Sequence, residues 1–439
     1  MNLFLATGRD EAQAHGAGRG GQGMLFWLFL AAVMALCYFA QPLDFYHTVA
    51  PAASVDSHVR AITEGSSARQ LSLLLMGMWA AGWIVARRSQ LRLDGRLAAI
   101  ALAFLFLVVA SIGWADDPWL SAKRAAALLV FAVCCVAVAQ QVGVEDSASL
   151  VFWGGTLTLA LSVGAELALR TFTPLDPAYR FAGLMHANEQ GIYCGCLALA
   201  GLSLARRGRP HAAAYAVAAG VGFFFLLLTK SRISLVSALA GLGFYAALTS
   251  ARARYWLLVA STVSAFAAVP LVFLGLRGAA PFWALLRMGR PEDVSAIATL
   301  TGRAELWQAL LQYVAERPLL GYGYGGFWTP QRLTALVRHE GWALGSAHSQ
   351  YFEVLLQLGV VGLTAFCATA AAAFWRLVRG YRRHRVDGHA FAAALLVLVG
   401  VDMLVESRPF DPSLPMLSCL AVVAALAVSR GEWGPALRR

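Results

Sequence analysis

A histidine is the residue of this sequence best placed to act as a general base. His348 lies in Ser346-Ala347-His348-Ser349, where a long apolar run begins. We expect it in the first turn of the helix that this run forms, where the backbone N–H groups and the helix dipole create a positive field. Such a field favours the neutral imidazole, which can accept a proton. The alternative is a structural histidine that caps the helix or lies at a membrane interface.

Two arginines have the chemistry of phosphate ligands. Arg232 follows an apolar run in Thr229-Lys230-Ser231-Arg232, and Arg303 lies in the first turn of a predicted helix. A guanidinium offers a planar fork of donors that matches phosphate oxygens, and it stays charged. Arg303 opposes the dipole at its helix end, so we expect another group to hold it. The alternatives are a lipid headgroup contact for Arg232 and a surface ion pair for Arg303.

Several further polar residues are candidates for supporting roles. Arg180 and Asn188 could line the same pocket as the two arginines. Three carboxylates lie in or beside apolar runs, where a charge is costly, and we expect each to pair with an arginine. These carboxylates are Glu353, Asp402 and Glu406, with Arg408 close to the last two.

The sequence predicts neither a metal site nor a cofactor. No histidines have the spacing of His-x-x-x-His, and the seven cysteines all fall in apolar runs without partners at metal-ligand spacing. Disulfides are not expected either. The Gly323-Tyr324-Gly325-Gly326 run follows no strand and lacks the Lys-Ser or Lys-Thr of a nucleotide-binding loop, so it predicts a turn.

Composition assigns the chain to the membrane proteins. Its 439 residues are 59% hydrophobic and only 13% charged, with a mean hydropathy of +0.63, which excludes a soluble domain. A formal charge of +11 would suggest nucleic acid as a partner of a soluble protein. Here most lysines and arginines lie in short breaks between apolar runs, as the positive-inside rule expects. We therefore expect membrane lipids, and no nucleic acid, as partners.

The apolar runs predict an all-α integral membrane protein with about twelve transmembrane helices. The predicted spans are near 24–40, 71–86, 97–113, 124–140, 149–169, 189–205, 211–228, 231–249, 255–276, 349–376, 389–405 and 412–429. Residues 1–23 are polar and glycine-rich, which predicts a flexible tail. Residues 24–276 thus hold helices 1–9, residues 349–430 hold helices 10–12, and residues 431–439 form a second tail.

Residues 277–348 form a predicted helical lobe between the ninth and tenth spans. Its first helix begins near Thr301 and Glu305 and ends at Pro318, and its second runs from Thr329-Pro330 to Arg338. A glycine-rich turn joins the two helices.

Charge bias predicts which side of the membrane each break faces. Basic residues gather in alternate breaks, which the positive-inside rule assigns to the cytoplasm together with both termini. The lobe then faces the opposite side. On that side the rule disfavours cations, so topology does not explain four of them. These are Arg180, Arg232, Arg303 and Arg408.

Four short motifs in this order resemble those of the O-antigen ligases and their relatives, the O-antigen polymerases and pilin oligosaccharyltransferases. They are Ser231-Arg232, Gly302-Arg303-Ala304-Glu305-Leu306-Trp307, Ala347-His348-Ser349 and the pair Gly359 and Gly362. The resemblance covers roughly residues 180–420 in motifs and the whole chain in topology. Ser349 departs from the pattern, because asparagine more often follows this histidine in the family.

The resemblance implies a GT-C-type inverting glycosyltransferase of the bacterial inner membrane, active on the periplasmic face in lipopolysaccharide biosynthesis. The donor would be a glycan on undecaprenyl pyrophosphate, and the acceptor a sugar hydroxyl of lipid A–core. The family's functional histidine and two arginines correspond to His348, Arg232 and Arg303. His348 would be the general base, and the arginines would bind the pyrophosphate without a metal.

Two alternatives stay open. An O-antigen polymerase or another lipid-linked oligosaccharide transferase would use the same residues. A transporter of lipid-linked sugars would place its polar residues near the bilayer midplane, often within internal repeats. Here the candidate residues gather at one outer face around a lobe, which favours an enzyme.

Overall fold

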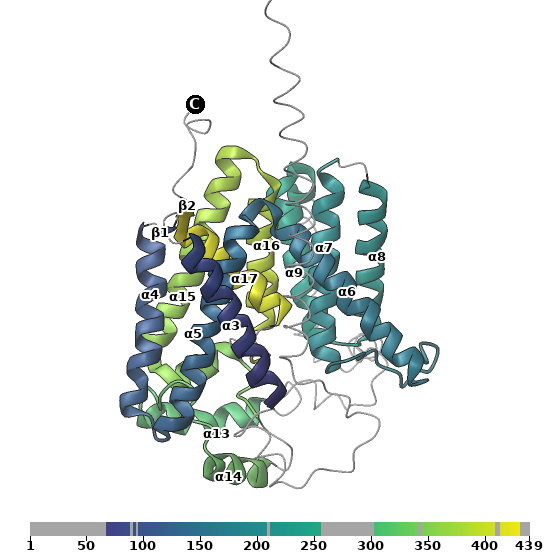
Figure 1. Cartoon of the computed structure of the whole chain (residues 1–439). Helices are drawn as coiled ribbons and strands as arrows, with labels where there is room; N and C mark the ends of the chain where they lie inside the picture. The colour runs from purple at the N-terminus through teal and green to yellow at the C-terminus, as the bar shows by residue number, and fades with distance from the viewer. Residues whose placement is uncertain are drawn as a thin grey trace, which may run out of the picture.

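The structure is a computed structural model that describes residues 67–87, 91–93, 95–208, 211–255, 303–340, 345–408 and 413–430. Its long helices form a bundle, with two helices beyond one end and a two-stranded sheet at the other (Figure 1). The first half contributes α3 (Ser67–Arg87), α4 (Gly95–Ala110), α5 (Pro118–Gln141), α6 (Ser147–Ala168), α7 (Ala187–Arg206), α8 (Ala212–Leu228) and α9 (Arg232–Thr249). The second half contributes α13 (Arg303–Glu316), α14 (Pro330–Glu340), α15 (Gln350–His384), α16 (Asp387–Asp402) and α17 (Leu414–Ala427).

Short elements complete the described chain. A 3₁₀ turn, η3 (Ser111–Trp114), extends α4, and η4 (Val144–Asp146) precedes α6. Strand β1 (Leu91–Leu93) pairs antiparallel with β2 (Val428–Arg430). The sheet ties the start of α4 to the end of α17, at the end of the bundle opposite α13 and α14 (Figure 1).

The helices confirm that this is a multi-pass membrane protein. A helix occupies each predicted span that the structure describes. Within the described residues, five helical segments are long and apolar enough to cross a bilayer: Gly95–Trp114, Pro118–Gln141, Val144–Ala168, Arg232–Thr249 and Gln350–His384. The predicted spans 24–40 and 255–276 lie outside the described residues, Tyr255 excepted, so the total of twelve stays a prediction.

Helices α7 and α16 lie at the centre of the bundle. Most residues of both helices are buried, on all faces, as expected for helices that have neighbours on every side. Small residues let α7 approach α9 closely: a Cβ at Gly191 would lie 2.8 Å from the Ser234 Cβ, and one at Gly195 would lie 3.0 Å from the Ala238 Cβ. This packing fixes the start of α9 beside the start of α7.

The part of the predicted lobe that the structure describes, from Arg303 onward, has the expected two helices and a small core of its own. Helix α13 ends at Glu316, just before Pro318, and α14 begins at Pro330, as predicted. The Thr329 hydroxyl accepts a hydrogen bond from the Arg332 N–H at 3.4 Å, as an N-cap would. The core includes Leu306, Leu310, Tyr322, Phe327, Trp328, Leu333, Leu336 and Val337. Residues 277–302 and 341–344 of the predicted lobe lie outside the described part of the chain.

The lobe docks onto a break in α15 that the apolar pattern did not predict. Gly359 has φ 64° and ψ −166°, which interrupts the helix. The Val360 N–H then donates to the Pro318 carbonyl at 2.9 Å, and the Tyr322 N–H donates to the Leu356 carbonyl at 3.0 Å. α15 also continues to His384, beyond the predicted end at 376. The start of α15 is therefore bonded to the lobe and separated by the break from the rest of the helix.

Replacing Gly359 with alanine is expected to destabilise the protein by about 3 kcal/mol, because only glycine adopts this backbone region readily. An added Cβ would also lie 2.2 Å from the Leu319 carbonyl group. Thermal unfolding of the purified protein measures the effect. Gly164→Ala is the matched control, because nothing lies within 4 Å of its Cβ position. Equal melting temperatures for the two variants would contradict this account of the break.

Candidate active site

Three of the predicted site residues converge on one carboxylate, that of Glu406. The Arg303 guanidinium donates to Glu406 Oε1 at 2.6 Å, and the Asn188 amide donates to the same oxygen at 2.7 Å. His348 Nδ1 lies 3.8 Å from Glu406 Oε2. The three groups come from the start of α13, the first turn of α7 and the residues before α15. Glu406 itself follows the end of α16, so four separate segments meet here. Asn188, Arg303, His348 and Glu406 together form the Glu406 cluster.

Electrostatics keep Glu406 ionised. Burial on its own would raise the pKa of Glu406, but the contact with His348 and the charges of Arg303 and Arg408 outweigh it and lower the pKa to about 2. The stability that this carboxylate contributes is therefore present at neutral pH and is lost only as the pH falls towards 2. The expectation that another group holds Arg303 is confirmed, and the Glu406 side chain, 13% exposed, is that group.

His348 does not lie inside the first turn of its helix, so this part of the sequence prediction is wrong. Ser349 is the N-cap, because its hydroxyl accepts a hydrogen bond from the Phe352 N–H at 3.4 Å. His348 precedes the cap with a left-handed backbone, φ 49°, a conformation in which histidine is enriched among non-glycine residues. The Ser349 N–H donates to Ser407 Oγ at 3.0 Å. This bond holds the segment against the Glu406 loop.

Glu353 positions the residue before His348. Within the described residues it has no hydrogen bond to an arginine, although Arg124 interacts with it electrostatically. Its carboxylate accepts hydrogen bonds from the Ala347 N–H at 2.6 Å, from Trp328 Nε1 at 3.0 Å and from Gln357 Nε2 at 2.8 Å. The Ala347 carbonyl in turn accepts from Trp307 Nε1 at 2.7 Å. Ala347 is therefore held from α15 and from α13 at once, which fixes the backbone that carries His348.

The predicted pairing of Asp402 with an arginine is confirmed. Arg408 Nε donates to Asp402 Oδ2 at 2.7 Å, and Arg408 Nη1 lies 3.8 Å from Glu189 Oε1. Asp402 is fully buried and Arg408 nearly so. This ion pair closes the loop between Asp402 and Arg408, and Glu406 lies within that loop.

Arg180 joins the cluster through a hydrogen bond to Asn188. Its Nη2 donates to Asn188 Oδ1 at 3.3 Å, and its Nε donates to the Thr229 carbonyl at 3.1 Å. Glu166 in α6, which the sequence patterns did not single out, holds the loop that carries Arg180. Its carboxylate accepts from the Gly183 N–H at 2.7 Å and from the Ala182 N–H at 3.1 Å. A carboxylate at the end of an apolar run was the available signal.

Arg232 begins α9, as predicted, beside the Asn188 end of α7. Ser231 is the N-cap of α9 and accepts from the Ser234 N–H. The Ser234 hydroxyl donates to the Asn188 carbonyl at 2.9 Å. Arg232 therefore lies at a helix end that is bonded to the Glu406 cluster through Asn188.

In the described part of the chain, no three His, Cys, Asp or Glu side chains converge as metal ligands would. Positive charge at the cluster comes instead from arginines.

The chain is similar to known proteins. Residues 214–367 match the model of the O-antigen ligase family, a segment that contains Arg232, Arg303 and His348. The chain is also 25% identical, over 377 residues, to the exopolysaccharide production protein ExoQ of Rhizobium meliloti strain 1021, with 78% of each chain covered. The chain is thus similar to the O-antigen ligase family over residues 214–367 and to a protein of exopolysaccharide production over most of its length.

Proposed function

We propose that the protein is an O-antigen ligase. It would move O-antigen polysaccharide from undecaprenyl pyrophosphate to a sugar hydroxyl of lipid A–core and invert the anomeric configuration. The similarity to the O-antigen ligase family and to a protein of exopolysaccharide production supports the coarser assignment, a membrane glycosyltransferase of ligase or polymerase type. The observation that carries the proposed chemistry, which a ligase and a polymerase would share, is the convergence of His348, Arg303 and Asn188 on Glu406.

In this proposal each member of the cluster has one task. Glu406 orients the His348 ring from the Nδ1 side, so that Nε2 takes the proton of the acceptor hydroxyl. The hydroxyl oxygen then attacks the anomeric carbon, and the bond to the pyrophosphate oxygen breaks. Arg303, Arg232 and Arg180 stabilise the negative charge that develops on the leaving pyrophosphate. The proton stays on His348 until the product leaves.

We place the reaction on the periplasmic face of the inner membrane, with the lobe on that side and both termini in the cytoplasm. The positive-inside rule supports this orientation. The contacts are in keeping with it, because residues from breaks assigned to one side bond to each other. Arg303 and Asn188 meet Glu406 at one end, whereas Arg206 bonds to the Thr249 carbonyl at the other.

A deletion strain tests the proposal. Without a ligase, lipopolysaccharide should lack O-antigen, while O-antigen of normal length accumulates on the carrier lipid. Electrophoresis of lipopolysaccharide and analysis of the carrier-linked glycans measure both. Transfer by the purified protein in detergent would also exclude a transporter.

The second candidate is a polymerase, which extends a glycan on the same carrier. The similarity to a protein of exopolysaccharide production favours it. Carrier-linked glycan of a single repeat in the deletion strain would decide for the polymerase and against the ligase.

Transfer is expected to be independent of divalent metal, because arginines supply the positive charge at the cluster. The check is the transfer rate of the purified protein with excess EDTA, which should equal the rate without it. Activity that disappears with EDTA and returns with magnesium or manganese would contradict the expectation.

A further inference from the structure

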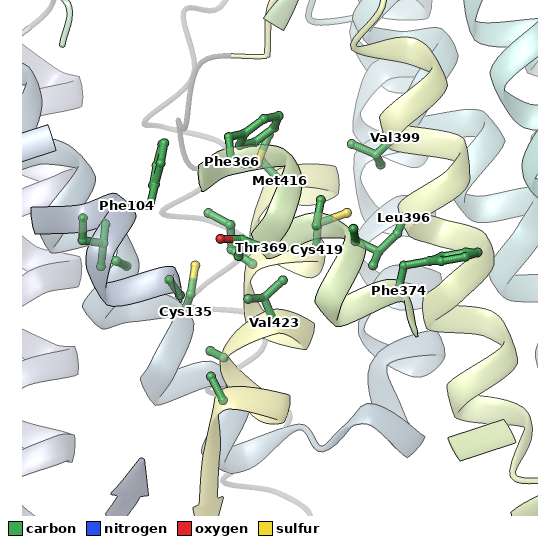
Figure 2. Close-up of a pocket in the computed structure, with 18 of the residues that line it drawn as sticks. Phe104, Cys135, Phe366, Thr369, Phe374, Leu396, Val399, Met416, Cys419 and Val423 are labelled. Atoms are coloured by element: carbon green, nitrogen blue, oxygen red, sulfur yellow. The ribbon is translucent and has the colours of Figure 1, made fainter. Parts of the chain in front are cut away.

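An apolar pocket of about 510 Å³ lies inside the bundle. Side chains from α4, α5, α15, α16 and α17 line it, and Figure 2 shows Phe104, Cys135, Phe366, Thr369 and Met416 among them. Its volume falls within the range of about 300–1,000 Å³ that is usual for ligand pockets. The pocket is thus large enough for a ligand.

The lining accepts hydrocarbon and offers almost nothing to a polar ligand. The hydroxyl groups on its wall are already used: Tyr351 donates to the Gly400 carbonyl at 3.1 Å, and Thr369 donates to the Ala365 carbonyl at 2.8 Å. The other lining residues are aliphatic, aromatic or sulfur-containing, or are glycine. A polar group placed here would lose its hydrogen bonds to water without replacement.

The pocket is elongated, and its two ends are lined by residues from opposite ends of the bundle. At one end it is lined by Tyr351 and Met403, and the Met403 carbonyl accepts a hydrogen bond from the Gln350 N–H at 2.9 Å. Gln350 and Met403 stand close in sequence to His348 and Glu406, respectively. The opposite end is lined by Leu93 and Val428, which face each other in the β1–β2 pair. An elongated ligand in the pocket would therefore have one end beside the candidate active site.

We propose that this pocket holds the hydrocarbon chain of the lipid-linked saccharide, with the pyrophosphate at the Glu406 cluster. The inference rests on the proposed function, because it takes the donor to be lipid-linked. One polar end next to the charged residues and one apolar chain along the pocket match the two halves of such a lipid. The pocket thereby aligns the anomeric carbon with His348 and contributes affinity that depends on chain length.

Filling the pocket tests the proposal. Ala132 of α5 lines it, whereas Ala126 of the same helix is exposed and does not. Ala132→Phe should raise KM for a long-chain polyprenyl donor about tenfold, the loss expected when roughly two methylene groups are displaced from apolar contact. KM for a short-chain prenyl donor should stay unchanged, and Ala126→Phe should change neither. Ala132→Leu, a smaller change, keeps the test available if the phenylalanine variant fails to fold.

A binding measurement separates this inference from the proposed function. The probe is a fluorescent long-chain prenyl monophosphate, titrated against the full-length protein in nanodiscs. Weaker binding by Ala132→Phe than by Ala126→Phe supports the pocket even if the protein transfers no glycan. Equal KM values and equal probe affinities for both variants would overturn the pocket while leaving the transferase proposal standing.

The remaining outcome concerns a resident phospholipid. If a phospholipid occupied the pocket, native mass spectrometry would detect it on the purified protein and on Ala126→Phe but not on Ala132→Phe. If KM for the long-chain donor is also unchanged, the occupant is a structural lipid and the proposal is wrong.

Discussion

Replacing His348 with alanine is expected to slow glycan transfer by about 10²–10⁴-fold, the usual contribution of a general base. The reason is its place beside Glu406, whose carboxylate lies 3.8 Å from Nδ1. Without the imidazole, the acceptor hydroxyl has no group to take its proton as it attacks. Donor binding should change little, because the arginines remain. Initial rates with the purified protein, together with donor titration, measure the two effects separately.

The backbone at this position calls for a second variant. His348 has φ 49°, and asparagine tolerates this conformation better than alanine does. His348→Asn therefore keeps the local structure and removes only the base, so its rate should fall as far as that of His348→Ala. His211→Ala, at an exposed histidine before α8, is the matched control and should leave the rate unchanged. Turnover close to that of the unchanged protein in His348→Asn would remove this residue from the mechanism.

Replacing Arg303 with alanine is expected to reduce transfer by about 10²–10³-fold, as when one donor to a developing negative charge is removed. Lysine should be nearly as poor, because it conserves the charge but not the two-pronged geometry. The alanine and lysine variants of Arg232 should be impaired in the same way. We propose that Arg232, from the membrane helices, binds the pyrophosphate from the side opposite Arg303, which comes from the lobe. Rates and donor affinities of the alanine and lysine variants measure this. Arg338→Ala, at an exposed arginine of α14, is the control.

The pair with Glu406 offers a sharper test of Arg303. Arg303→Ala leaves the largely buried carboxylate without its nearest cation, which should also lower stability. Adding Glu406→Gln removes that charge, so the double variant should regain thermal stability. Its transfer rate should stay far below that of Glu406→Gln alone if Arg303 binds the phosphates. A double variant that transfers as fast as Glu406→Gln alone would mean that Arg303 is an ion-pair residue only.

The sequence determined the features that depend on neighbouring residues. Apolar runs located the described helices, because the length and hydropathy of a span are local properties. Helix starts at Arg232 and Pro330 were predicted correctly, because capping involves residues three or four positions apart. The chemistry of His348 and Arg303 also follows from residue type. Basic residues gather in alternate segments between the apolar runs, and this alternation predicted that His348 and Arg303 lie on the same side of the membrane.

Only the tertiary structure decided which side chains hold these residues. Asn188 and Glu406 are hydrogen-bonded although 218 positions separate them, and Arg303 lies 103 positions from the same carboxylate. No local pattern encodes such pairs, so Glu406 could not be distinguished beforehand from Glu353, whose partners prove to be Trp328, Gln357 and a backbone amide. The break at Gly359 likewise exists because the lobe supplies the Pro318 carbonyl to the Val360 N–H. An isolated helix has no such acceptor, and the physical reason for the difference is that long-range packing chooses among partners that the local sequence leaves equivalent.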